Sequence, residues 1–553
     1  MISRINGHSE EHQKLEAAYL EDRKQLIEKE RKLRYDYSFK QSLSPVAKRA
    51  CNIVVKLRSH ESETVWGSNG TGADDEFPGM MFTLAKPKIK TTKLWEIVRK
   101  MPKGALLHSH LEAMVNIKWF WGVVLDTPGM YMFSDIPLDS QTAFENAKIQ
   151  FKYSPEPVTG TPSDIFSSSY EASNLVSAKE AAKAFPGGVF TSSSPAGVDG
   201  YLAWLESKTT ITPEESLKHH EGIGKIWAKF QSIFMVLNGA IWYEPIFRKF
   251  VRHLFEKLYE DGIFWVDLRV AFHMQFQEEG TGRILPKTEV LRVFGEILNQ
   301  YKAENPEFWG SRIIWTSLRI LDHELIKENM KECIEAKESF PEIVAGFDLV
   351  GQEDLGHSLH ELIPELLWFK QECSKRNLEI PFYFHAGETV DEGSAADDNA
   401  FDAILLGTKR IGHGYSLCRH PHLMELVKEK QICIETCPIS NEVLRLTASI
   451  LSHPLPELVA HGVPTTINND DPGILGQEDS GSLSHDYWQA LQAFGNFGLG
   501  GIGSLARTSV KFATYDDHMD LESKVRLDKL ALWDSKWEEF CAWVVEAFGE
   551  WEK

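Results

Sequence analysis

Short apolar runs recur along the chain between residues 104 and 473, and each is followed by enough residues for a helix. In intervening segments such as "HSLHELIPELLWFKQECSKRN", apolar residues return at spacings of three and four, which indicates amphipathic helices. Eight strand-then-helix units favour a (β/α)8 TIM-type barrel, an α/β fold, over an open sheet. The eight predicted strands lie within 104–110, 262–270, 312–320, 342–351, 380–388, 409–417, 431–441 and 464–473.

The N-terminal part of the chain lies outside this alternation. Residues 8–40 have the pattern of a charged helix that "SLSP" ends, with four apolar side chains near one face. That face could pack on the barrel or on another subunit, and a solvated helix is an equal alternative. Residues 58–90 are rich in Gly, Ser and acidic side chains and predict a linker. The four apolar residues are Leu15, Tyr19, Leu26 and Leu33.

A second segment outside the alternation is the Ser-, Pro- and Gly-rich stretch at residues 134–215, which is too long for an ordinary connection. We expect it to be an insertion after the first barrel strand, either functional or a lid. The chain also exceeds the length at which one simple core usually stops growing. We therefore predict a helical extension and linker over residues 1–95 and a barrel over residues 96–553.

Net charge and cysteine content indicate which classes of binding partner are excluded and in which cellular compartment the protein lies. A formal net charge of −21 repels phosphate backbones and anionic lipids, which argues against nucleic acids and membrane surfaces as main partners. No apolar run is long enough to cross a bilayer, and the first thirty residues lack the apolar core of a signal peptide. Seven cysteines are few and odd in number, which is typical of reduced thiols. We expect a cytoplasmic protein in which Cys433 and Cys437 are buried strand residues.

Polar side chains gather where the predicted strands end. In a (β/α)8 barrel the chemistry lies at the carboxyl ends of the strands. A single histidine after a strand usually has a structural role, but agreement among five strand ends is hard to explain in that way. The strand-end residues are His108, His110, Gly351, His385, Glu388, His413, Asp470 and Asp471.

The types of these residues predict a metal site. His108 and His110 are one residue apart, so in a strand they project from the same face. Together with His385 and Asp470 they would hold a borderline cation such as Zn²⁺ and leave room for a water molecule. The metal would lower the pKa of that water towards about 7 and so generate hydroxide at neutral pH.

The remaining strand-end side chains are suited to proton transfer and to orienting the hydroxide and the substrate. Glu388 comes three residues after His385, so it can face the same cavity without binding metal. A carboxylic acid there can donate and accept a proton at the group under attack. His413 and Asp471 remain to orient the hydroxide and the substrate. The set predicts a hydrolase that adds water to an sp² carbon.

Several motifs identify a family. The segments "MPKGALLHSHLEA", "FHAGET", "RIGHGYSL", "CPISNEVL" and "NNDDPG" resemble the motifs of the adenosine deaminase family, within the amidohydrolase superfamily. The segments "GQEDLGHSLHE" and "LSHDYW" are similar to its adenosine deaminase growth factor branch. The resemblance covers roughly residues 95–540 and keeps the order of the motifs throughout.

This resemblance implies hydrolytic deamination of adenosine or 2'-deoxyadenosine to the inosine product and ammonia. It implies one Zn²⁺ per subunit, a proton transferred from Glu388 to N1 of the purine, and an attacking hydroxide held by His413, with Glu388, His413 and Asp470 as the catalytic residues. It also implies contacts from Asp471 to N7 and from the N–H of Gly351 to N3. The implied zinc ligands are His108, His110, His385 and Asp470, and the implied substrate contacts are Gly351, Asp471, Glu112 and His110.

Two departures from the family pattern stand out. Smaller adenosine deaminases have an Asp on a ribose hydroxyl where this chain has Glu112, so the sugar contact and the ribose specificity are open, and a surface acid is the alternative. The growth factor branch is largely secreted and has a disulfide in its insertion, whereas residues 52–332 here contain no cysteine. We therefore expect an intracellular relative, and we expect the N-terminal extension to form a homodimer as it does in that branch.

Two other functions compete with adenosine deamination. The first is a related aminohydrolase acting on another 6-substituted purine, such as adenine, an N6-methylated adenosine or AMP. A nucleotide would need a basic pocket, and no Arg or Lys cluster lies near the strand-end motifs. The second is a non-catalytic barrel kept for binding, which predicts loss of a metal ligand or of the proton-transfer acid, and all of these residues are present.

Overall fold

The structure is a computed structural model that describes residues 10–67, 76–156, 164–189, 194–477 and 483–552. Every one of the eight predicted runs overlaps a strand, and every pairing between these strands is parallel. The eight strands are β1 (Gly104–Leu106), β5 (Ile263–Ala271), β8 (Gly310–Leu318), β9 (Val344–Val350), β10 (His385–Ala386), β11 (Arg410–His413), β12 (Cys433–Thr436) and β13 (Thr465–Ile467).

The strands follow one another in chain order around the centre of the molecule. Two four-stranded sheets have the orders β1-β5-β8-β9 and β10-β11-β12-β13. Parallel bridges connect them on both sides, between Phe347 and Phe382 and between Ser109 and Asp470. The neighbours are therefore those of a (β/α)8 barrel, and the predicted fold class is confirmed.

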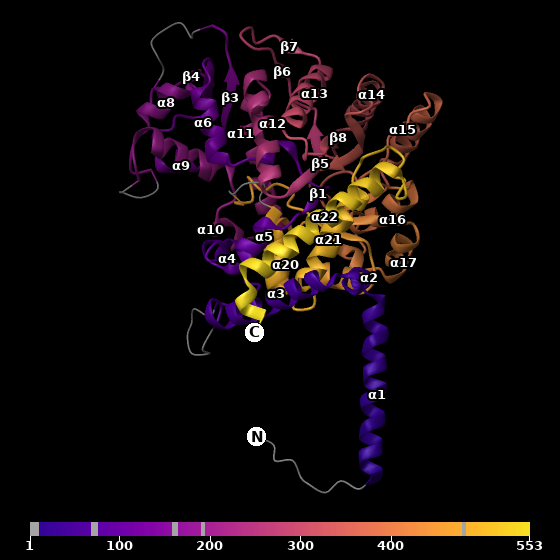
Figure 1. The fold of residues 1–553 in the computed structure, drawn as a ribbon. Coiled ribbons are helices and arrows are strands. Elements are labelled where there is room, and N and C mark those ends of the chain that lie inside the picture. Colours follow the sequence, from indigo (N-terminus) through magenta and orange to yellow (C-terminus); the bar gives the residue numbers. More distant parts are fainter. Residues whose placement is uncertain (1–9, 68–75, 157–163, 190–193, 478–482, 553) are drawn as a thin grey trace.

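Helices cover the outside of the strands (Figure 1). In α13, Val290, Leu291, Phe294 and Leu298 are buried at spacings of three and four, which is the pattern of a helix with one face on a core. A short antiparallel pair, β6 (Phe276–Gln277) and β7 (Ile284–Leu285), precedes this helix. The outer helices are α13 (Lys287–Glu304), α14 (His323–Ser339), α15 (Ile363–Lys375), α16 (Ala395–Leu406), α17 (Pro421–Glu429), α18 (Pro438–Val443), α19 (Leu455–Ala460), α20 (Leu483–Ala493), α21 (Gly498–Phe512) and α22 (Lys524–Ala547).

The N-terminal region differs from its prediction in two ways. The expected single helix over residues 8–40 is two helices, because Asp36 is buried at the turn between them and pairs with Arg34 and Lys40. Much of the expected linker over residues 58–90 is helical, since α3 packs against α22; residues 68–75 lie outside the described part. The helices are α1 (Glu10–Leu33), α2 (Tyr37–Ser42), α3 (Pro45–Thr64), α4 (Phe82–Ile89) and α5 (Lys93–Lys100).

A folded segment separates β1 from β5 and lies beside the barrel, at the upper left of Figure 1. The expected insertion, residues 134–215, falls inside it, and residues 157–163 and 190–193 lie outside the described part. Strands of this segment form an antiparallel sheet in the order β3-β2-β4. Its elements are η1 (Leu111–Ala113), α6 (Ile117–Asp126), β2 (Met130–Ser134), α7 (Gln141–Asn146), β3 (Ile149–Tyr153), β4 (Val176–Ser177), α8 (Ala178–Ala184), α9 (Gly197–Thr209), α10 (Pro213–Ser216), α11 (Ile223–Ile241) and α12 (Glu244–Glu260).

The structure also bears on the expectations that the cysteines are reduced and that no segment crosses a membrane. All seven cysteines of the chain are free, and Cys433 and Cys437 are buried, the first within β12 and the second just after it. Among the described helices, none combines the length and the apolar composition that crossing a membrane requires.

Candidate active site

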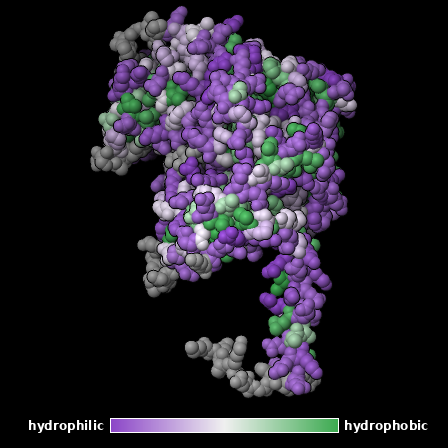
Figure 2. Space-filling view, viewed as in Figure 1, coloured by the Kyte–Doolittle hydropathy of each residue, from purple (hydrophilic) through white to green (hydrophobic). Residues whose placement is uncertain are grey.

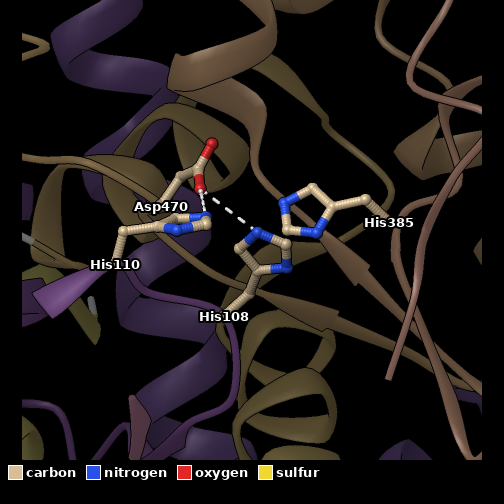
Figure 3. Close-up of side chains that lie close together, drawn as sticks. All are labelled: His108, His110, His385 and Asp470. Carbon is tan, nitrogen blue, oxygen red and sulfur yellow. Dashed lines mark ion pairs between the residues drawn. The ribbon is translucent and has the colours of Figure 1, made fainter. Parts of the chain in front are cut away.

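Four predicted metal ligands converge at the carboxyl ends of β1, β10 and β13. Each side chain offers one ligand atom, and these atoms all lie within 4.8 Å of one another. Oδ1 of Asp470 is 3.2 Å from Nε2 of His108 and 3.1 Å from Nε2 of His110. Figure 3 shows the Asp470 carboxylate facing the rings of His108 and His110, with the His385 ring beside them.

The local backbone explains this convergence. Extended pairing continues past the end of β1, because Ser109 bridges Asp470 and His110 bridges Arg269. Alternate residues of an extended segment share a face, which brings His108 and His110 to the same side. Asp470 has a φ of +59°, a left-handed conformation that is uncommon for a residue with a side chain and often marks a functional site.

The donor set fits a divalent cation. Within the described residues, Nε2 of His108 and Oδ1 of Asp470 are buried and have no hydrogen-bond partner of suitable geometry. Burial lowers the pKa of His385 to about 3 and also lowers the pKa of His110, so both rings are neutral. Burial alone would raise the pKa of Asp470, but the surrounding imidazoles hold it well below its ordinary value. Neutral imidazoles with one carboxylate are a common ligand set for catalytic zinc.

Two buried carboxylates orient two of the predicted histidine ligands, and sequence reasoning missed both. Nδ1 of His385 lies 2.7 Å from Oδ2 of Asp348, and Nδ1 of His108 lies 2.8 Å from Oε2 of Glu435. Each contact directs the opposite ring nitrogen, Nε2, towards the ligand cluster. The available clue was an acid within each apolar run, in "GFDLV" and "ICIET", where a solvent-facing residue was not expected.

A chain of buried charges holds these carboxylates in place. Arg269 contacts Asp348 at 2.7 Å and Glu435 at 2.8 Å, and Arg410 contacts Glu435 and also Asp267, at 2.8 Å. All five side chains are fully buried. The arginines hold the pKa of Glu435 well below its ordinary value, although burial alone would raise it. Removal of one partner from such a network typically costs about 3–5 kcal/mol, because a buried charge is left uncompensated.

Glu388 and His413 lie next to the ligand cluster. Nδ1 of His413 is 3.5 Å from Oε1 of Glu388, and its Nε2 is 3.5 Å from Oδ2 of Asp470. Asn441 also contacts His413, with 3.1 Å between its Nδ2 and the histidine Nδ1. Burial, with a smaller effect of Asp470, raises the pKa of Glu388 well above its ordinary value. The Glu388 carboxyl is therefore suited to carry a proton near neutral pH.

Glu353 fixes the turn that carries Glu388. Its carboxylate accepts hydrogen bonds from the N–H groups of Gly387, at 3.2 Å, and Glu388, at 2.8 Å, and from Nδ2 of Asn399, at 2.6 Å. Gly387 has a φ of +77°, and a Cβ there would lie 2.7 Å from Oγ of Ser416. Glycine is required because both the backbone angle and the neighbouring hydroxyl exclude a side chain.

A cavity of about 480 Å³ opens above the ligand cluster. All the residues predicted from the sequence except His108 line this cavity. One wall is the apolar face of α11, with Trp227, Phe230 and Phe234, which the sequence analysis did not assign to the site. The predicted residues that line the cavity are His110, Glu112, Gly351, His385, Glu388, His413, Asp470 and Asp471.

Comparison with known proteins places this arrangement in a family. A family model described as adenosine deaminase matches residues 208–529, more than half of the chain. The chain belongs to the adenosine deaminase family. It is 32% identical to adenosine deaminase 2-A of Danio rerio, over 88% of this chain and 87% of that protein. It is also 32% identical to adenosine deaminase 2 of Sus scrofa, over 84% of each chain.

A solved structure supports the fold of this family member. An amidohydrolase from Burkholderia ambifaria, crystallised with bound Zn, matches with a TM-score of 0.50 at 14% identity. The match covers 82% of this chain and 94% of that protein. This likeness concerns the fold, and the family model and the curated relatives confirm the family that the motifs predicted.

Proposed function

We propose that this protein catalyses the Zn²⁺-dependent hydrolytic deamination of adenosine and 2'-deoxyadenosine to inosine or 2'-deoxyinosine and ammonia. The observation that carries the proposal is the convergence of His108, His110, His385 and Asp470 on one point, with Glu388 beside them, at the base of one cavity. Membership of the adenosine deaminase family and relatives named adenosine deaminase support the same reaction.

Different side chains of the protein have different roles in the proposed reaction. His108, His110, His385 and Asp470 would hold the zinc ion, which lowers the pKa of a water molecule and so supplies hydroxide at neutral pH. Glu388 protonates N1 of the purine, which makes C6 electrophilic. His413 and Asp470 hold and orient the attacking oxygen.

Other groups hold the purine. Asp471 contacts N7, and the N–H of Gly351 contacts N3. Within the described residues, Oε1 of Glu388 and Oδ1 of Asp471 are buried without a hydrogen-bond partner, as expected for groups that a ligand completes. A purine that lacks one of the matching atoms leaves a buried polar group unpaired, which makes discrimination between purines steep.

Glu112 is proposed to contact a sugar hydroxyl. It is 4% exposed and lines the cavity, and its Oε1 has no hydrogen-bond partner within the described residues. The alternative of a surface acid is not compatible with this burial. His110, the neighbouring metal ligand, also borders the substrate on this side of the cavity.

A related aminohydrolase acting on another 6-substituted purine is the competing function. The cavity lining argues against AMP, because among the described residues that line the cavity Arg319 is the only lysine or arginine. Arg319 is fully buried, and its Nη2 donates to the carbonyls of Leu349 and His385, each at 3.0 Å. A phosphate would instead meet the carboxyl groups of Glu112 and Asp471. Adenine and N6-methylated adenosine lack phosphate, so this charge argument does not apply to them. Measured turnover of each compound distinguishes them from adenosine as the substrate.

The direct test is conversion of adenosine by the purified protein, followed by the loss of its ultraviolet absorbance. Activity and metal content are measured on the same sample before and after a chelator and after Zn²⁺ is added back, with AMP, adenine and N6-methyladenosine as parallel substrates. The proposal expects chelator-sensitive formation of inosine. Full metal occupancy without adenosine turnover would overturn it, and turnover of another purine alone would favour the competing function.

We also propose that the protein is a cytoplasmic homodimer. Seven free cysteines suit a reducing compartment. Helix α1 projects from the body of the molecule, and hydrophobic patches are visible along it (Figures 1 and 2). Single exposed apolar residues are common, but a row of them on a projecting helix favours a contact with a second copy. The row consists of Leu15, Tyr19, Leu26 and Leu33, which are 62–69% exposed.

A further inference from the structure

A polar pair in the upper wall of the cavity has no part in the chemistry above. Asn238 lies on α11 and is 2% exposed, and His273 follows β5; both line the cavity. Nδ2 of Asn238 is 3.4 Å from Nε2 of His273. We infer that Asn238 and His273 form a subsite that recognises a sugar hydroxyl and so determines which nucleosides the enzyme accepts. This inference rests on the proposed function and adds two specificity-determining residues to it.

The amide of Asn238 has a fixed orientation. Its Oδ1 accepts a hydrogen bond from Nε1 of Trp242 at 3.2 Å, and an indole N–H can only donate. The amide nitrogen therefore faces His273, whose ring is also hydrogen-bonded to the backbone of Ala271. An amide nitrogen carries two hydrogens, and His273 accounts for one of them. The second remains as a donor for a ligand oxygen.

The strand order places the sugar on this side of the cavity. With N1 of the purine at Glu388 and C6 near His413, the reacting edge faces the ends of β10 and β11. The glycosidic nitrogen N9 lies on the opposite side of the purine ring system. In the order β1-β5-β8-β9-β10-β11-β12-β13, the strands across the barrel from β10 and β11 are β1 and β5. These strands lead to Glu112 and His273, so the sugar is directed towards them.

The groups on this side match a hydroxyl. Helix α11, which carries Asn238, packs against η1, which carries Glu112. Glu112 provides an acceptor in the unpaired Oε1, and Asn238 provides a donor. A hydroxyl donates and accepts at once, whereas a phosphate only accepts at neutral pH and would be repelled by the carboxylate. The chemical class recognised here is therefore an unphosphorylated sugar.

The surroundings strengthen this recognition. His273 is exposed, whereas Asn238 is 2% exposed and lies beside the adjoining apolar surface of α11 that Trp227, Phe230 and Phe234 form. When a polar group is shielded in this way, an unmade hydrogen bond is costly, so a substrate without the hydroxyl is disfavoured. Asn238 belongs to the segment between β1 and β5, whereas His273 belongs to the loop after β5, so this added segment and a barrel loop together determine specificity for the sugar.

The test compares substrates that lack one hydroxyl each. The holoenzyme and the variants Asn238→Leu and His273→Leu are assayed with adenosine and with 2'-, 3'- and 5'-deoxyadenosine, and metal content is measured for each. Wild type should favour adenosine over at least one deoxynucleoside by about tenfold or more. In both variants kcat/KM for adenosine should fall by a similar factor, mainly through KM, while the disfavoured deoxynucleoside changes little.

Control variants separate recognition from general damage. Lys225→Gln removes an exposed charge on the same helix, away from the cavity lining, that pairs with Glu221 at 3.3 Å, and it should leave turnover of all four substrates unchanged. His273→Gln keeps a polar side chain and should retain part of the discrimination.

Three results would overturn the inference. One is a wild-type enzyme that does not discriminate among the four nucleosides. Another is a pair of leucine variants that lose activity equally on all four substrates. The third is a metal-loaded wild type that converts none of them, which would overturn the proposed function as well, whereas the first two results leave that function intact.

Discussion

Oδ2 of Asp348 lies 2.7 Å from Nδ1 of His385, so a residue inside the barrel fixes the ring of a proposed metal ligand at its mouth. Asp348 also pairs with Arg269 at 2.7 Å. The contact with the His385 ring and the positive charge of Arg269 hold the pKa of Asp348 well below its ordinary value, although burial alone would raise it. The negative charge makes the imidazole a better ligand.

Replacement of this charge should weaken metal binding. The variant Asp348→Asn keeps the size of the side chain but removes the charge, and we expect about 10- to 100-fold lower metal affinity, measured by competition with a chelator. Circular dichroism of the Asp348→Asn variant checks that the protein still folds when Arg269 has lost this charged partner. Glu342→Gln, an exposed acid just before the same strand, is the matched control and should not change the affinity. Equal affinity in wild type and Asp348→Asn would show that this contact is only structural.

Two carboxylates should have different roles: Glu388 in proton transfer and Asp470 in metal binding. Glu388→Gln should keep the metal and lose turnover by about 10²- to 10⁴-fold, the range for loss of a general acid or base. Asp470→Ala should lose metal and activity together. Metal analysis and steady-state kinetics on both variants check this. Parental turnover by Glu388→Gln would remove its assigned role, and unchanged metal content in Asp470→Ala would remove that residue from the ligand set.

Glu353 should act on the rate through the position of Glu388. In Glu353→Gln one amide hydrogen-bonding position becomes a donor, so the side chain cannot accept from both Gly387 and Glu388. We expect kcat to fall about 10- to 100-fold, because small displacements of a reacting group have effects of this size. Metal content and melting temperature should stay near those of Glu361→Gln, a nearby surface control. A kcat equal to wild type would contradict this positioning role.

The exposed apolar face of α1 should be needed for the proposed homodimer. Leu26→Asp places a charge in that face and should yield monomers, as judged by light scattering during size-exclusion chromatography. Lys24→Asp introduces the same charge on the opposite side of the helix and should leave the dimer intact. If the Leu26→Asp variant dimerised with the same dissociation constant as wild type, this surface would be excluded as the interface.

Glu442 should make stability depend on pH. Its carboxylate accepts from the N–H of Phe82 at 2.6 Å and of Ile450 at 2.9 Å, but burial raises its pKa from 4.5 to about 8. The folded state therefore binds the proton more tightly than the unfolded state. The stabilisation is fully present below pH 4.5 and is lost as pH rises through about 8.

The measurement is the free energy of unfolding of wild type and Glu442→Gln across this pH range. One such group contributes a slope of up to about −1.4 kcal/mol per pH unit, which the variant lacks. The difference between the two proteins should therefore change steadily between pH 4.5 and pH 8 and become constant above it. Parallel pH curves would mean that Glu442 titrates at its ordinary value in the folded protein.

The amino-acid sequence by itself determined the eight strands and the residues at their ends. Each strand is an apolar run of its own, and the alternation with amphipathic helices leaves few folds available. In a parallel barrel all carboxyl ends meet at one face, so His108, His385 and Asp470 could be grouped without coordinates.

Only the tertiary structure decided what surrounds those residues. Asp348 and Glu435 lie within apolar runs, and their link to Arg269 depends on which strands are neighbours across the barrel. The placement of Asn238 depends on how the segment after β1 packs over the mouth of the cavity. Local patterns describe periodicity along one element, whereas these contacts join residues from separate elements, and the packing of the whole chain brings them together.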